Sequence, residues 1–381
     1  MLLAVVCLFG TVAFAVPLGN APSLTLNFKY PDSSITANAG LFVRGDGCGL
    51  NWAKGVEAQK AASDTWTVSL TCSNNFNTTS GVLSYKALVG DQDWQLGANS
   101  MVRVGQLETV DNYPWFYSSK GSFSYIRNVH SKELGNDRDL VIYVPPSYAE
   151  NTFKTIQHVL VMHDGQNLFD PKTSFLGIAW MCQDTVNKLV IEGQMEEIAI
   201  IGVDNTGDRT DELTYSYDKT VPGGGKGDKY LDFLESTVIP TVADKFRFNV
   251  TSRANLGILG SSLGGLISCY AGWTRGNKYG KAGCMSSSFW WNSQDFNSTI
   301  IPKPAPPPSE AFYLDSGDSG PGKDDKTETL LVRSDMEGKG WEMGKNLFYY
   351  LDKGGEHNEK YWGDRFHVPM ADLYPPMPVE W

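Results

Sequence analysis

The sequence predicts a small all-β domain followed by a larger α/β domain that is built on a mostly parallel sheet. Two patterns predict this division. From about residue 22 to 105, alternating segments such as 65–70 and 83–89 are typical of half-buried strands in an antiparallel sandwich. From about residue 122, uninterrupted apolar runs alternate with helical patterns, as expected of strands that are covered on both faces.

The apolar runs that we expect to form strands of the α/β domain are residues 139–144, 158–162, 198–203, 256–259 and 312–314. Segment 229–246 carries apolar residues at helical spacing, so we expect a helix there that packs on the sheet. We therefore divide the chain into a leader (1–15), a sandwich (16–115) and an α/β domain (116–381).

Composition limits the partners that this chain can have. It has 381 residues with a net charge of −11, and no basic run offsets the excess of acidic side chains. This balance argues against a nucleic-acid or anionic-membrane partner. Beyond the leader, no apolar stretch is long enough for a membrane helix, so we expect no membrane span.

Several features predict secretion. Residues 1–15 are apolar and end in Ala13-Phe14-Ala15, which has the small-x-small form of a signal-peptide cleavage site. Glycosylation sequons begin at Asn77, Asn249 and Asn297. We therefore expect an extracellular glycoprotein.

The cysteines fit an oxidising compartment, where some of them are expected to pair. Cys48 and Cys72 lie in one small N-terminal region and are the first predicted disulfide. Cys269 with Cys284 is a second candidate pair, which leaves Cys182 unpaired. No cysteine has zinc-ligand spacing, so we predict no metal site. The serine chemistry predicted below requires no cofactor.

The stretch Gly260-Ser261-Ser262-Leu263-Gly264-Gly265 is the most informative motif. It follows an apolar run and opens a helix-like segment. A strand, a serine flanked by glycines and a helix form a nucleophile elbow, in which neighbours without bulk permit a sharp turn. The pattern predicts Ser262 as a nucleophile and the amide of Leu263 as an oxyanion donor.

Chain order limits the partners of Ser262, because the acid and then the histidine follow the serine in this type of site. Of the five histidines, only His357 and His367 follow Ser262. We favour His357, which lies in a polar loop preceded by two glycines, whereas His367 lies in a stretch that looks packed. The acid is expected in the loop after the run 312–314, where Asp315, Asp318, Asp324 and Asp325 all qualify by position.

A second oxyanion donor is expected in the loop after an early strand. The segment His163-Asp164-Gly165-Gln166-Asn167 follows the run 158–162. Its glycine lets the backbone approach a substrate closely, and Gln166 is the expected amide donor. We expect His163 to be structural.

Taken together, these residues resemble the esterase D-like branch of the α/β-hydrolases, which includes enterochelin and feruloyl esterases. The similarity runs from about residue 122 to 375, through segments 161–169, 202–205 with Arg209, 260–265, 288–291, 313–317 and 355–359 with Trp362. It implies an α/β-hydrolase fold and a serine esterase. Family members often carry the acid as the second residue of an Asp-Asp or Asn-Asp pair before a helix. The pair Asp324-Asp325 fits this pattern, so the resemblance implies Asp325 as the acid. The inserted stretch 318–321 leaves Asp324 and Asp318 open.

The resemblance also gives substrate hypotheses. Trp290 and Trp291 follow the elbow and are expected to line a pocket for phenolic or sugar-linked esters. In the N-terminal region, Trp52 and Trp94 are similar to the sugar-stacking tryptophans of starch-binding modules. The other interpretation is that the sandwich is a structural cap on the esterase domain and that these tryptophans are core residues. The alternative is a secreted, non-catalytic carbohydrate-binding protein on an inactive esterase scaffold.

Overall fold

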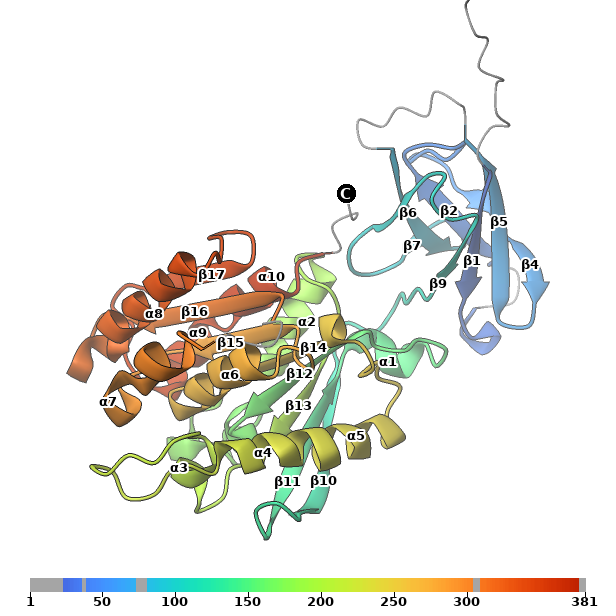
Figure 1. Ribbon diagram of the computed structural model, residues 1–381. Coiled ribbons are helices and arrows are strands. Elements are labelled where there is room, and N and C mark those ends of the chain that lie inside the picture. The colour runs from blue at the N-terminus through green and yellow to red at the C-terminus, as the bar shows by residue number, and fades with distance from the viewer. Residues whose placement is uncertain (1–22, 36–38, 73–80, 304–308, 377–381) are drawn as a thin grey trace, which may run out of the picture.

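The computed structural model describes residues 23–35, 39–72, 81–303 and 309–376 (Figure 1). The described chain forms two small sheets, which are followed by an eight-stranded sheet with helices on both faces. The prediction of an α/β domain is confirmed. The expected leader over residues 1–15 and the sequon at Asn77 lie outside the described residues.

The N-terminal part is a β-sandwich. One sheet has the order β4-β5-β1-β9, and the other has the order β3-β2-β6-β7 with β8 paired to β6. Alternate side chains from both sheets, including Leu26, Phe28, Val43 and Tyr85, are buried between them. The strands are β1 (Ser23–Lys29), β2 (Leu41–Gly45), β3 (Val56–Glu57), β4 (Gln59–Ala62), β5 (Thr65–Thr71), β6 (Val82–Val89), β7 (Asp93–Trp94), β8 (Ser100–Arg103) and β9 (Thr109–Asn112).

The large sheet has the order β10-β11-β13-β12-β14-β15-β16-β17. β10 and β11 pair antiparallel, β11 is antiparallel to β13, and all the other neighbours are parallel. The strands are β10 (Ser122–Ser131), β11 (Asn136–Val144), β12 (His158–His163), β13 (Ile198–Val203), β14 (Leu256–Ser261), β15 (Lys281–Met285), β16 (Ala311–Gly317) and β17 (Leu347–Asp352).

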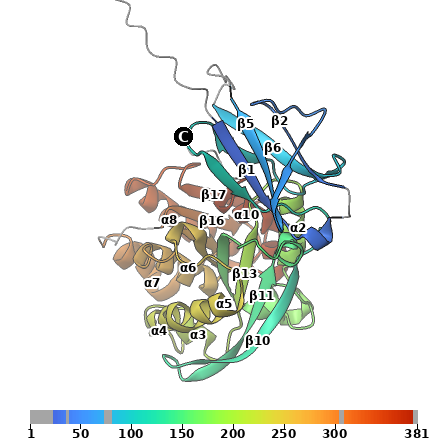
Figure 2. The same cartoon turned by 90° about the vertical axis from the view of Figure 1, so that its right-hand side faces the viewer.

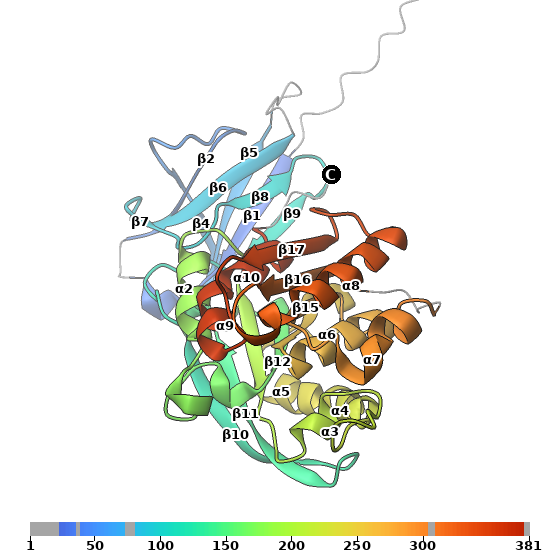
Figure 3. The same ribbon diagram turned by 90° about the vertical axis from the view of Figure 1, so that its left-hand side faces the viewer.

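Helices cover both faces of this sheet (Figure 3). Apolar side chains of α4, α5, α6 and α8 share one core cluster with the sheet, and those of α2 and α10 share a second cluster on the other face. The helices are α1 (Pro146–Glu150), α2 (Cys182–Ile191), α3 (Arg209–Glu212), α4 (Gly227–Phe233), α5 (Ile239–Lys245), α6 (Leu263–Thr274), α7 (Trp291–Asp295), α8 (Lys326–Gly338), α9 (Glu359–Arg365) and α10 (His367–Leu373). No helix among the described residues is long and apolar enough to span a bilayer.

One disulfide lies in the sandwich and another in the α/β domain. The predicted pair Cys48–Cys72 is confirmed and lies in the sandwich. The second candidate pair is also present: Cys269–Cys284 ties α6 to β15 directly behind the serine turn. Cys182 is a buried free thiol at the start of α2.

The sandwich contacts the α/β part at the amino end of the parallel strands (Figure 2). The Tyr30 hydroxyl donates to Glu150 at 2.9 Å, and the Asn151 side-chain amide donates to the Lys29 carbonyl at 2.8 Å. Glu150 and Asn151 lie at the end of α1, shortly before β12 begins. Since the predicted site residues follow strand ends, the sandwich lies at the opposite end of the sheet from them.

Candidate active site

Ser262 occupies a sharp turn between β14 and α6. Its backbone has φ 59° and ψ −124°, a conformation that L-residues rarely adopt. The flanking glycines are required by close contacts, because a Cβ on Gly260 would lie 2.8 Å from the His163 ring, and one on Gly265 would lie 2.4 Å from Ser287 Oγ. This is the nucleophile-elbow geometry that the sequence predicted.

A hydrogen-bonded chain connects Ser262 to a histidine and a buried carboxylate. Ser262 Oγ lies 2.9 Å from Nε2 of His357, and Nδ1 of the same ring lies 2.7 Å from Oδ1 of Asp324. His357 lies in the loop between β17 and α9. With the proton on Nδ1, the ring donates to the carboxylate and Nε2 accepts from the serine hydroxyl. His367, the other histidine considered, lies on α10 with Nδ1 against the Asp364 carbonyl.

The carboxylate beside His357 belongs to Asp324, and not to the expected Asp325. The turn Pro321–Asp325 holds four successive residues at positive φ, from Gly322 to Asp325. This backbone path turns Asp324 inward and leaves Asp325 half-buried beside Trp290. Burial raises the pKa of Asp325 to about 6. Of the other candidates, Asp318 accepts from the Gly354 amide at 2.8 Å, and Asp315 is buried below Asp324.

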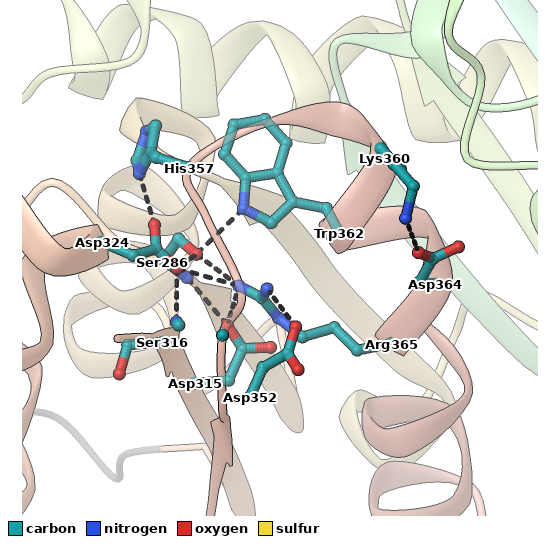
Figure 4. Close-up of polar contacts among 12 residues, drawn as sticks. Ser286, Asp315, Ser316, Asp324, Asp352, His357, Lys360, Trp362, Asp364 and Arg365 are labelled. Carbon is teal, nitrogen blue, oxygen red and sulfur yellow. Dashed lines mark hydrogen bonds and ion pairs between the residues drawn. The ribbon is translucent and has the colours of Figure 1, made fainter. Parts of the chain in front are cut away.

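Hydrogen bonds to the second oxygen of Asp324, Oδ2, stabilise its ionised carboxylate form. Oδ2 accepts from Ser286 Oγ at 2.6 Å and from the Gly317 amide, and Nη2 of Arg365 lies 3.3 Å away (Figure 4). Burial opposes ionisation of Asp324, but the hydrogen bonds from His357, Ser286 and Gly317 outweigh it and hold the pKa below its usual range.

A buried network below Asp324 was not predicted from the sequence. Arg365 Nη2 lies 3.0 Å from Asp315 and also donates to Ser286 Oγ (Figure 4). Trp362 Nε1 donates to the same oxygen at 2.9 Å, and its ring lies edge-on to His357 with 4.9 Å between centroids. Trp362 and Asp315 belong to segments of the family resemblance, whereas Ser286 lies outside those segments. Arg365 lies in an ordinary helical sequence and carries no local signal.

Of the predicted oxyanion donors, Leu263 directly follows Ser262 in the chain, and Gln166 lines the same cavity as Ser262. Leu263 is the first residue of α6, so its amide has no acceptor within the helix. Gln166 lies in the turn after β12 and lines a cavity of about 400 Å³ that also contains Ser262 and His357, here called the Ser262 cavity. The side chain of Gln166 is engaged elsewhere, since its Oε1 accepts from the Asn205 amide at 3.2 Å.

A charged pair forms one wall of the Ser262 cavity. Arg209 donates from Nε and Nη2 to the two oxygens of Asp164, at 2.7 and 2.8 Å. Glu359 lines the same cavity, and burial raises the pKa of its carboxyl. His163 lines the same cavity, and its burial lowers the pKa of the imidazole to about 4 and keeps it neutral. The inner part of the cavity is therefore polar.

The two predicted pocket tryptophans have different environments. Trp290 is 41% exposed and lines a cavity with Asp325, Glu356 and His357. Trp291 is only 1% exposed, and its Nε1 donates to the Ser216 carbonyl at 3.0 Å. The expectation that Trp291 lines a substrate pocket is therefore wrong, because its ring is part of the buried core cluster.

The two tryptophans that the sequence predicted to bind sugar lie on the surface of the sandwich. Trp52 and Trp94 are both partly exposed, with 6.2 Å between ring centroids and 30° between planes. Arg44 lies over the Trp94 ring at 5.1 Å and donates to Asp91 at 2.8 Å. Throughout the described residues, no cluster of His, Cys, Asp or Glu has the arrangement of a metal site.

Residues 131–373 match the model of a protein family described as "Putative esterase". The chain belongs to this esterase family. The match covers every element from β11 to α10, including the turns that carry Ser262, Asp324 and His357. The esterase is therefore a carboxylic ester hydrolase by family.

Curated relatives are similar over parts of the esterase. The uncharacterized protein YbbA of Bacillus subtilis is 26% identical over 259 residues, which are 64% of this chain and 95% of YbbA. The siderophore triacetylfusarinine C esterase of Aspergillus fumigatus is 36% identical over 102 residues, which are 25% of this chain and 34% of that protein.

Solved structures share the fold. A ferulic acid esterase structure covers 67% of this chain and 98% of its own, with 18% identity and a TM-score of 0.51. The enterobactin esterase of Shigella flexneri covers 92% of this chain and 93% of its own, with 14% identity and a TM-score of 0.50. The second match is long enough to include the N-terminal part of the esterase as well.

Proposed function

We propose that this esterase is a serine hydrolase in which Ser262 is the nucleophile, His357 the general base and Asp324 the orienting acid. The observation that carries the proposal is the continuous chain from Ser262 Oγ through both nitrogens of His357 to Asp324, with steps of 2.9 and 2.7 Å. Nucleophile, base and orienting group in hydrogen-bond reach of one another are the signature of nucleophilic acyl transfer.

The reaction follows from these positions. Ser262 Oγ attacks the ester carbonyl carbon while His357 Nε2 takes the hydroxyl proton. The amides of Leu263 and Gln166 stabilise the negative oxygen of the tetrahedral intermediate. His357 then gives its proton to the departing alcohol, and an acyl-enzyme remains. Water, deprotonated by His357, attacks the acyl carbon, and His357 returns that proton to Ser262 Oγ as the bond to the acyl carbon breaks and the acid is released. These steps require no cofactor.

Covalent labelling tests the mechanism. A fluorophosphonate probe is expected to label the wild-type protein and to leave Ser262→Ala unlabelled. The matched control is Ser261→Ala, which removes the adjacent buried hydroxyl at the end of β14 and is expected to keep the label. Absence of label on folded wild type would instead support the alternative of a non-catalytic scaffold.

The proposed substrates are phenolic or sugar-linked esters. Trp290 supports this by offering a half-exposed aromatic face beside His357, and relatives of the chain are named for ferulic acid, enterobactin and triacetylfusarinine C. Hydroxycinnamoyl esters are therefore expected to have a higher kcat/KM than plain acyl esters of the same alcohol. Equal values for the two groups would refute the aromatic preference.

A second proposal concerns sugar binding by the sandwich. The partly exposed rings of Trp52 and Trp94, whose planes are tilted by 30° to each other, offer apolar faces on which sugar rings can stack. Because the sandwich meets the amino end of the sheet, a bound glycan would tether the enzyme and would not enter the Ser262 cavity. Starch pull-down with Ser262→Ala, compared with Ser262→Ala/Trp52→Ala, is expected to show binding by the first protein alone.

We also propose that the protein is secreted and glycosylated. Two disulfides among the described residues support an oxidising compartment. Asn249 and Asn297, the sequon residues that the structure describes, have side-chain amides at the surface. Expression in a eukaryotic secretory host is expected to give protein in the medium that loses mass on treatment with a glycosidase. Retention inside the cell without glycan would contradict this proposal.

A further inference from the structure

A loop of exposed apolar side chains, residues 175–181, lies between the turn after β12 and helix α2. Phe175 is 60% exposed and Leu176 is 78% exposed, and Ile178 and Met181 are exposed as well. No charged residue occurs from Thr173 to Gln183, in a chain with a net charge of −11. Single exposed apolar residues are ordinary, but a cluster of this kind marks a binding surface.

The backbone of this loop is fixed in an unfavourable shape. Leu176 and Met181 both have a φ of 53°, which is uncommon for side chains of their bulk. The loop is held there by hydrogen bonds to Asn167, whose side chain accepts from the Phe175 amide at 2.9 Å and whose carbonyl accepts from the Trp180 amide at 2.9 Å. The exposed apolar face is therefore built into the structure.

The loop is continuous with the candidate active site. Phe175 and Trp180 line the Ser262 cavity, together with Ser262 and His357. The hydroxyl groups of Thr173 and Ser174 also donate to the carbonyl of Gln166, the proposed oxyanion donor. The polar pair Asp164–Arg209 lines the cavity together with Phe175, and the exposed side chains of Leu176 and Ile178 follow Phe175 in the chain.

We propose that residues 175–181 form an apolar binding lip for one arm of the ester substrate. The inference rests on the proposed function and adds a substrate class: an ester with polar groups near the reacting carbonyl and an extended apolar chain or ring further out. The inner cavity fits the polar part because of the charged pair Asp164–Arg209 and Glu359. The lip fits the apolar arm because its exposed surface is removed from water when the arm binds.

Two series of soluble esters test the lip. One series lengthens the acyl group from acetyl to octanoyl on p-nitrophenol, and the other lengthens the alcohol of acetate esters, both below the concentration at which the esters aggregate. Wild-type kcat/KM is expected to rise with chain length in at least one series. Leu176→Asn and Ile178→Thr are expected to lower kcat/KM for the long esters by roughly 10-fold, and to leave the acetate ester within about twofold.

The variants are chosen to keep the loop folded. Asparagine tolerates the positive φ of Leu176, and threonine keeps the branched shape of Ile178. Leu107→Asn is the matched control, since Leu107 is also an exposed leucine but lies in the sandwich. It is expected to change neither series.

The outcomes separate the lip from the proposed function. If the variants keep the wild-type ratio of kcat/KM between long and short esters, the proposal that residues 175–181 bind a substrate arm is refuted, while the serine mechanism stands. A rate that rises only when the esters aggregate would also overturn it, because the loop would then bind a lipid surface and not one substrate arm. A wild type that neither cleaves p-nitrophenyl acetate nor reacts with fluorophosphonate would refute the proposed function itself.

Discussion

Asp324 Oδ1 lies 2.7 Å from Nδ1 of His357, while the carboxyl of its neighbour Asp325 lies beside Trp290. Two consecutive aspartates thus have opposite environments. Asp324 is buried, hydrogen-bonded and has a lowered pKa, whereas burial without comparable partners raises the pKa of Asp325 to about 6. Replacing each aspartate by asparagine in turn tests whether a carboxylate must be hydrogen-bonded to His357 or need only lie near it.

Asp324→Asn is expected to lower kcat by about 10⁴-fold, because a neutral amide does not hold the histidine in the tautomer that accepts from the serine. Asp325→Asn is expected to keep kcat within about threefold. Steady-state kinetics on p-nitrophenyl acetate measures both, with circular dichroism as a check of folding. A larger loss in the Asp325 variant would mean that the acid is misassigned.

Ser286 is predicted to position Asp324 for this role. Its Oγ donates to Asp324 and accepts from Trp362 and Arg365, so Ser286→Ala leaves a buried indole N–H without its acceptor. We expect kcat to fall roughly 10-fold, as for loss of a hydrogen bond to a charged group. The pKa of Asp324 is also expected to rise, which moves the acid limb of the pH–rate profile to higher pH.

The adjacent serine supplies the control for that experiment. Ser287 is equally buried, but its Oγ has no hydrogen-bond partner in the described part of the chain. Ser287→Ala is therefore expected to leave kcat and the pH–rate profile unchanged. Similar losses in both variants would show that Ser286 acts through general packing and not through Asp324.

Asp325 is predicted to make stability depend on pH. Its folded pKa of about 6 lies above the ordinary value of 3.8, so the folded protein holds this proton more tightly than the unfolded chain. The stabilising effect is complete below about pH 4 and is lost as the pH rises through about 6. Asp325→Asn removes the buried charge, so we expect the variant to be more stable at neutral pH, by up to about 3 kcal/mol.

Urea unfolding at several pH values measures this difference. The advantage of the Asn variant is expected to grow between about pH 4 and about pH 6, and to be constant above that range. An advantage that is the same at pH 4 and pH 7 would show that the ionisation of Asp325 is not its cause.

The sequence predicts what depends on local pattern and chain order. The strand, glycines and helix around Ser262 predicted it as the nucleophile, and the place of His357 after Ser262 in the chain predicted it as the base. The structure brings these two side chains into hydrogen-bond contact. Five apolar runs also predicted strands that are present as β11, β12, β13, β14 and β16.

The sequence does not predict features that depend on contacts between residues far apart in the chain or on unusual backbone turns. The choice between Asp324 and Asp325 depends on a turn in which four residues have positive φ, three of them not glycine, which no spacing rule anticipates. Strand β15 reads Lys-Ala-Gly-Cys-Met, has no β-branched or aromatic residue, and forms because its neighbours β14 and β16 pair with it. Arg365 reaches Asp315, which lies 50 positions earlier in the chain, only once the segment between them has folded back on the sheet.

Gly260 tests whether the serine turn itself sets the geometry. A Cβ at this position would lie 2.8 Å from both the His163 ring and the backbone carbonyl carbon of Gly264, and both are buried. Gly260→Ala therefore has to shift α6 or β14, and with them Ser262. Since a displacement of about 1 Å at a reacting group costs roughly 100-fold in rate, we expect at least that loss in kcat.

Gly338→Ala, at the end of α8 where a Cβ meets nothing within 4 Å, is the control and is expected to keep full activity. Full activity of Gly260→Ala would show that the turn tolerates bulk, and that its glycines do not determine the position of Ser262.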